Sequence, residues 1–166
     1  KHFSIRILLV VVAFPVFGVL IFLLPHQSHL AFNLAAVAAT ALAAAEVAGL
    51  FAARRMRTSR RLAPILAATL PAAAYLEMRG LIPPAAHGLW LPVAIAILLV
   101  GAILFQSSRG LPTLLAYVAS SAFTMLYPAL SLSFVVRLSS LPDPSLTIAF
   151  FLCLVFGNDM AAYFAG

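Results

Sequence analysis

Four acidic residues stand in the sequence, and two of them lie where a carboxylate is costly. Glu77 and Asp143 fall at the boundaries of apolar segments, whereas Glu46 and Asp159 each fall inside one. A carboxylate at membrane depth costs several kcal/mol unless it is paired, so such a residue is a functional candidate by default. Glu46 and Asp159 are therefore the residues on which a chemical function would most naturally rest.

Asp159 has neighbours that suit metal binding. Asn158 precedes it, and Tyr163 follows four residues later, on nearly the same face of a helix. An Asn-Asp pair offers hard oxygen ligands, which Mg²⁺ prefers. If the last apolar segment starts near Ser145, Asp159 lies about 21 Å along that helix. The alternative interpretation is that Asp159 makes an interhelical hydrogen bond.

Glu46 lies about two helical turns before Arg54. One interpretation is a carboxylate near a helix end that is satisfied by arginines of the following loop, and the other is a carboxylate that faces a polar cavity. The four histidines lie at ends or in loops, and we interpret them as interface residues. The sequence contains no nucleophile motif, Gly-rich phosphate loop or CxxC pair.

The composition decides what kind of fold must position these residues. Hydrophobic residues make up 64% of the chain and charged residues 8%, and the mean hydropathy is +1.13. Soluble domains carry about 25% charged residues. We therefore expect an all-α, polytopic integral membrane protein with a single membrane domain over residues 1–166. The net charge of +6 does not indicate nucleic-acid binding, because five arginines gather in one short run between apolar segments.

Spans of roughly 20 apolar residues divide the chain into about six transmembrane helices. The expected segments cover residues 7–24, 30–53, 62–78, 89–105, 111–136 and 145 to the end. In the second segment, small residues recur every four positions, at Ala41, Ala45, Gly49 and Ala53. Such a stripe permits close backbone approach, so we expect Ala45 and Gly49 to face another helix.

The loops predict an orientation with the N-terminus in the cytoplasm. Eight basic residues then lie inside and only Arg79 and Arg137 outside; the inside set is Lys1, Arg6, Arg54, Arg55, Arg57, Arg60, Arg61 and Arg109. The chain begins without a methionine and stops at Gly166 within an apolar segment. We therefore expect this chain to be part of a longer protein, and to lack that protein's C-terminal helices.

The stretch 156–166, Phe-Gly-Asn-Asp-Met-Ala-Ala-Tyr-Phe-Ala-Gly, resembles the phosphatidate cytidylyltransferases, also called CDP-diacylglycerol synthases. Bacterial members show Asp, a small or hydroxyl residue, Gly, Ala, Tyr, two further positions and Gly. The matching residues are Asp159, Ala162, Tyr163 and Gly166. Met160 and Ala161 depart from the usual Thr or Ser followed by Gly.

This resemblance implies a nucleotidyltransferase that makes CDP-diacylglycerol and pyrophosphate from CTP and phosphatidate. Asp159 would be the catalytic residue and a ligand of Mg²⁺, and Asn158, Tyr163 and Glu46 would bind substrate. The implied partners are CTP, phosphatidate, the lipid bilayer and a second copy of the chain in a homodimer. The implied location is the inner (cytoplasmic) membrane, as a multi-pass protein. CTP is cytoplasmic, which agrees with the side expected for Asp159.

Two other functions fit the same sequence features. One is a transporter or channel subunit in which Glu46 and Asp159 couple to ions or protons, since prolines and small-residue stripes suit a transporter equally well. The other is a related membrane lipid kinase that uses CTP. A Lys-Asp and His-Gly-Gly block downstream of Gly166 would favour the cytidylyltransferase.

The orientation generates a first prediction. A cysteine placed at Ser59, within the arginine-rich run, should not react with an impermeant thiol reagent added outside intact cells, because this run dominates the charge bias. Ready labelling from outside would show that the predicted orientation is wrong.

Overall fold

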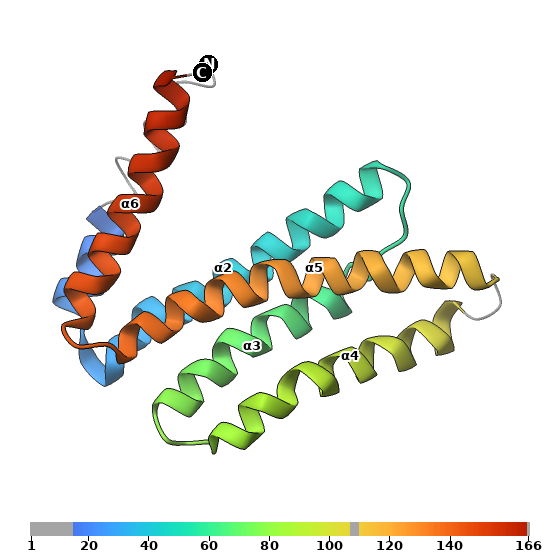
Figure 1. Ribbon diagram of the computed structural model, residues 1–166, viewed down its shortest axis with the longest axis horizontal. Coiled ribbons are helices and arrows are strands. Elements are labelled where there is room, and N and C mark those ends of the chain that lie inside the picture. Colours follow the sequence, from blue (N-terminus) through green and yellow to red (C-terminus); the bar gives the residue numbers. More distant parts are fainter. Residues whose placement is uncertain (1–14, 107–109, 166) are drawn as a thin grey trace. The chain divides into compact units, whose positions relative to one another are not determined.

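The computed structural model describes residues 15–106 and 110–165, and every regular element in these ranges is helical (Figure 1). The elements are η1 (Val19–Leu23), α2 (His26–Ala53), α3 (Leu62–Met78), α4 (Pro84–Gln106), α5 (Leu111–Arg137), η3 (Leu138–Ser140) and α6 (Pro144–Ala165). The all-α prediction is confirmed.

Three helical stretches are long and apolar enough to cross a membrane, namely His26–Ala53, Leu111–Ser140 and Pro144–Tyr163. Two apolar helices, Leu62–Met78 and Gly88–Leu104, are shorter. Six spans are therefore not confirmed. The first expected segment, residues 7–24, is described only from residue 15 onward, and η1 lies in that part.

Most helix boundaries follow the sequence signals. α3 begins and ends where predicted, and α5 begins at Leu111 as predicted. In α2 the residues Gln27 to His29 have φ between 52° and 58°, so right-handed helix begins at Leu30. The start of α4 differs, because Pro84 to Gly88 are helical rather than part of the preceding loop. Proline suits a first helical position, where its missing N–H is not needed.

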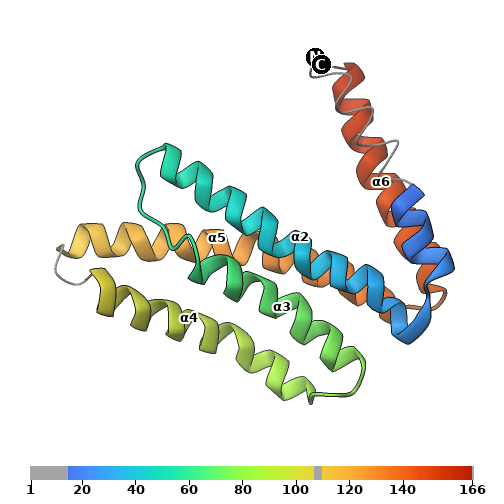
Figure 2. The ribbon, with the colours of Figure 1, turned by 180° about the vertical axis from the view of Figure 1, so that it is seen from behind.

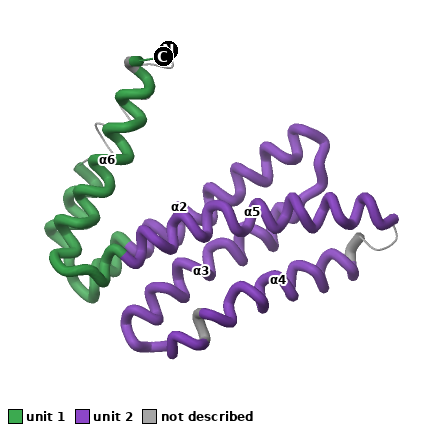
Figure 3. Tube along the Cα trace, in the orientation of Figure 1, with its two compact units in different colours: residues 1–32, 138–166 green, residues 33–137 purple. Residues whose placement is uncertain are grey.

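The chain forms two compact units, residues 1–32 with 138–166 and residues 33–137 (Figure 3). In the first unit, residues 17–23 pack beside α6. The Phe17 ring lies 6.3 Å from the Phe156 ring and 6.4 Å from the Phe32 ring, centroid to centroid. Ser145 Oγ also donates a hydrogen bond of 3.3 Å to the Ile21 carbonyl.

The second unit is built around α3, the shortest of its four helices. One buried cluster draws side chains from all four helices; it comprises Ala44, Ala63, Leu66, Ala67, Leu70, Ala94, Leu98, Met125 and Ala129. α3 supplies four of these nine residues, and both views show it beside α4 and α5 (Figures 1 and 2). The core of this unit therefore depends on α3.

The expected packing face of α2 was wrong by one residue. Ala45 and Gly49 are exposed, and a Cβ added at Gly49 would have no neighbour within 4 Å. The buried face instead carries Ala36, Thr40, Ala44 and Ala48, which also recur every four residues. In an alanine-rich helix two adjacent small-residue stripes satisfy the same spacing rule, so spacing alone cannot choose between them.

The basic residues of the second unit separate to its two ends. The five arginines of residues 54–61 lie between α2 and α3, whereas Arg79 follows α3 and Arg137 ends α5. α3 and α5 run in the same direction, because the Ser59 amide meets Ser121 at one end and Glu77 meets Arg137 at the other. This separation agrees with opposite sides for the two groups. Which side is cytoplasmic stays a prediction.

The corrected face of α2 gives a matched pair of substitutions. Ala44→Leu should lower the free energy of unfolding by about 1–3 kcal/mol, because the added atoms have no space in the packed cluster. Ala45→Leu, one residue away, should change it little. Unfolding of the detergent-solubilised protein measures both, and equal effects would contradict the assigned face.

Candidate functional site

The three candidate residues of the C-terminal motif lie together on α6 and face outward. Asn158, Asp159 and Tyr163 are all exposed, and Tyr163 is 48% exposed. Within residues 15–106 and 110–165, Asp159 makes no hydrogen bond or ion pair. The interhelical hydrogen bond considered for Asp159 is therefore not found among the described residues.

Among the residues that the structure describes, these three do not belong to a ready-made metal site of several protein ligands. In the described part of the chain no group of three or more His, Cys, Asp and Glu side chains could hold one. Asp159 offers a single carboxylate. That is compatible with Mg²⁺ in nucleotide sites, where one or two carboxylates combine with substrate phosphates and water rather than forming an all-protein cage.

Glu46 belongs to the other unit, on α2, and is exposed. No ion pair joins it to the arginines that follow α2, as far as the structure describes the chain. The pairing with these arginines that the sequence suggested is thus not found. The substrate-binding role suggested for Glu46 stays a prediction.

A second set of polar residues escaped the sequence analysis. Ser120, Ser121 and Thr124 are buried on α5, in the middle of an apolar helix, and we call them the hydroxyl cluster. Serine and threonine in membrane helices usually serve helix packing by hydrogen bonding across the interface. Their spacing, at positions i, i+1 and i+4 on one side of a helix, was the signal that could have revealed them.

The hydroxyl cluster holds the loop between α2 and α3, residues 54–61, which we call the basic loop. Ser120 Oγ donates a hydrogen bond of 2.6 Å to the Arg57 carbonyl, and the Ser59 amide donates one of 2.9 Å to Ser121 Oγ. Thr58 Oγ1 lies 3.4 Å from both Ser121 Oγ and Thr124 Oγ1. These contacts fix the backbone of the basic loop against α5.

Both ends of the basic loop are capped. At the α3 end, Ser59 Oγ accepts a hydrogen bond of 3.1 Å from the Leu62 amide. At the α2 end, the Met56 and Arg55 amides donate to the Phe51 and Ala52 carbonyls, at 2.9 and 3.0 Å. This is the Schellman arrangement, with Arg55 in the left-handed region at φ 58°. The end of α3 uses the same arrangement with Gly80 at φ 68°.

The arginine side chains of the basic loop point away from this anchored backbone. Arg54, Arg55, Arg57, Arg60 and Arg61 are all exposed. None of them forms an ion pair with a carboxylate of the described residues. The loop therefore presents five uncompensated positive charges on a backbone that hydrogen bonds hold in place.

Ser59 itself is only 9% exposed. A cysteine for topology labelling is therefore better placed at the exposed Arg60 than at Ser59, in a protein whose exposed Cys153 has been replaced.

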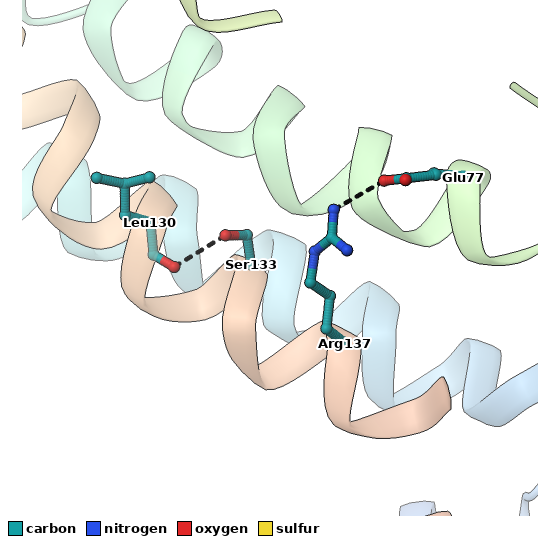
Figure 4. A network of polar contacts seen from close by, with 4 residues as sticks. All are labelled: Glu77, Leu130, Ser133 and Arg137. Atoms are coloured by element: carbon teal, nitrogen blue, oxygen red, sulfur yellow. Dashed lines mark hydrogen bonds and ion pairs between the residues drawn. The ribbon is translucent and has the colours of Figure 1, made fainter. Parts of the chain in front are cut away.

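One ion pair in the described chain joins α3 to α5 at the opposite end of the unit (Figure 4). Arg137 Nη2 lies 2.8 Å from Glu77 Oε2, with the side chains 44% and 18% exposed. The sequence placed Glu77 at the boundary of an apolar segment, and it did not predict the pair with Arg137 of another helix. Exposed ion pairs contribute only about 0–1 kcal/mol to the free energy of unfolding. We therefore assign the Glu77–Arg137 pair a role in aligning the ends of α3 and α5.

Comparison with known proteins adds the family. A family model described as the cytidylyltransferase family matches residues 4–166. No curated protein and no solved structure matches the chain. The family match covers the basic loop, the hydroxyl cluster and the whole C-terminal motif, residues 156–166.

The anchoring of the basic loop can be tested with one substitution and its control. Ser121→Ala leaves the Ser59 amide without its acceptor, so the free energy of unfolding should fall by about 1–3 kcal/mol. Ser131→Ala, on the exposed side of the same helix, removes only a hydroxyl that bonds its own helix at the Tyr127 carbonyl, and should have little effect. Thermal unfolding in detergent compares the two, and a Ser121→Ala protein as stable as Ser131→Ala would show that the contact is unimportant.

Proposed function

The chain belongs to the cytidylyltransferase family, the family of the phosphatidate cytidylyltransferases, and from this premise we propose that it makes CDP-diacylglycerol from CTP and phosphatidate in a membrane. The observation that carries the proposal is the family match over residues 4–166. Three helices with the length and hydropathy of membrane spans are the scaffold that a lipid substrate requires.

The proposed reaction transfers a cytidylyl group to a lipid phosphate. An oxygen of the phosphatidate phosphate forms a bond to the α-phosphorus of CTP. The bond from that phosphorus to the bridging oxygen breaks, and pyrophosphate leaves with the electron pair. The attacking oxygen is already anionic, so the protein's task is to align two polyanions and offset their repulsion.

We assign Asp159 as the catalytic carboxylate. Its place on an apolar helix, with Asn158 before it and Tyr163 one turn later, gives three polar groups within about 8 Å along α6. Asp159 would hold Mg²⁺ that arrives with the triphosphate, and Asn158 and Tyr163 would hydrogen-bond to substrate. When bound, Mg²⁺ offsets negative charge on the transferring phosphate. Glu46, in the other unit, is a proposed substrate-binding residue.

Asp159→Asn tests this assignment, with Asp143→Asn as a matched control. The amide keeps the size of the side chain and loses the charge, so CDP-diacylglycerol formation should fall by about 100-fold or more. Asp143 is an exposed acid in the connection before α6, and its substitution should leave activity near wild type. Glu46→Gln should have a smaller effect than Asp159→Asn.

The assay is CDP-diacylglycerol formation by the purified full-length protein across a Mg²⁺ titration. Wild-type activity of Asp159→Asn at limiting Mg²⁺ would overturn the site. Ion flux in liposomes, together with no CTP turnover by the wild-type protein, would instead support the transporter or channel alternative.

A further inference from the structure

We propose that the basic loop, residues 54–61, binds the phosphate headgroup of the lipid substrate. This inference rests on the proposed function for the identity of the lipid, and on the structure for the residues. The cation-rich loop is distinct from the C-terminal motif on α6, and the two lie in different units.

The first support is the supply of charge. The five arginines are exposed and have no acidic partner among the described residues. A guanidinium presents paired N–H donors that match two oxygens of a phosphate. A phosphomonoester such as that of phosphatidate carries between one and two negative charges near neutral pH, more than a phosphodiester lipid. The loop therefore suits a phosphomonoester best.

The second support is the rigidity of the loop. A loop that only marked the cytoplasmic side would need positive charge and no defined backbone. Here the Arg57 carbonyl and the Ser59 amide are both bonded to buried hydroxyls of α5. Holding the backbone in advance lowers the ordering cost of binding a ligand.

The third support is an arginine, Arg55, in a left-handed backbone conformation that glycine adopts at lower energetic cost. Arg55 occupies the left-handed position that ends α2, whereas Gly80 occupies the equivalent position at the end of α3. A residue with a Cβ costs roughly 1 kcal/mol or more in this conformation. The positive side chain at this position therefore carries a conformational cost that a ligand contact would offset.

The basic loop meets its neighbouring helices well inside their ends. The Ser59 amide meets α5 at Ser121, ten residues or about 15 Å from the helix start at Leu111. Leu62, at the start of α3, reaches Gly101 of α4, which lies five residues or about 8 Å before the helix ends at Gln106. The loop thus lies inward of the ends of both neighbouring helices.

The contact with Ser121 lies below the phosphate layer of a bilayer that α5 would span. α5 has 27 residues, or about 40 Å, close to the thickness of a bilayer with its headgroups. Because each headgroup layer is about 5–8 Å thick, a point about 15 Å from the start of α5 lies about 8–10 Å inside the hydrocarbon core. Irregular backbone is tolerated there only if protein buries it or if it lines a water-filled space.

Native mass spectrometry of the purified full-length protein can test the inference with a short-chain phosphatidate as probe. Arg60→Gln should weaken phosphatidate binding by about tenfold, because one charge-assisted hydrogen bond is lost. Arg79→Gln removes one exposed arginine from the other end of the unit and should leave binding unchanged. Arg60→Lys should recover part of the loss. The wild-type protein should bind phosphatidate more tightly than phosphatidylglycerol, and inorganic phosphate should compete poorly.

The outcomes separate this inference from the proposed function. Equal phosphatidate binding by Arg60→Gln and Arg79→Gln would overturn the inference, even if the protein makes CDP-diacylglycerol. Loss of CTP binding alone in Arg60→Gln would also overturn it, because the loop would then contact the nucleotide. Weakened phosphatidate binding in Arg60→Gln would support the inference even if the wild-type protein lacked cytidylyltransferase activity. An unchanged thermal midpoint of Arg60→Gln excludes loss of folding as the cause.

Discussion

The second unit depends on one requirement, which is that backbone polar groups held within an apolar helical bundle must find partners inside the protein. The basic loop meets it through α5, where buried hydroxyls accept from the Ser59 amide and donate to the Arg57 carbonyl. Without these partners the start of α3 could not lie level with Ser121. The hydroxyl cluster therefore allows α3 to be shorter than its neighbours.

The short α3 in turn organises the rest of the unit. It contributes Ala63, Leu66, Ala67 and Leu70 to the buried cluster, and it bonds to α4 where Trp90 Nε1 donates to Thr69 Oγ1 at 2.7 Å. Its far end is aligned with α5 by the Glu77–Arg137 pair. Because α3 begins inward of the ends of α4 and α5, the arginines before it are held within the length of these helices and not beyond their ends. The short length of α3 thus links the packing of the unit to the position of the arginines that we propose as ligand-binding residues.

The sequence predicted what depends on local composition. Apolar segments and the basic run between them located the helices, and α3 was bounded correctly because arginines flank it at Arg61 and Arg79. It could not choose between Ala44 and Ala45, since both positions carry a methyl group and only the neighbouring helix distinguishes them. The Glu77–Arg137 pair and the hydroxyl cluster were also missed, because both join residues about 60 positions apart. The sequence placed Asp159 on the correct helix. It could not identify the groups that contact Asp159, because these depend on how α6 packs against other segments.

Amide hydrogen exchange at Ser59 tests most directly the claim that α5 holds the basic loop. In the wild-type protein the Ser59 amide should be protected, because it donates to the buried Ser121 Oγ. In Ser121→Ala it should exchange about fivefold faster, which corresponds to loss of a hydrogen bond worth about 1 kcal/mol, while amides in the middle of α3 keep their rates. A Ser59 amide that exchanges as fast in the wild-type protein as in Ser121→Ala would contradict this account.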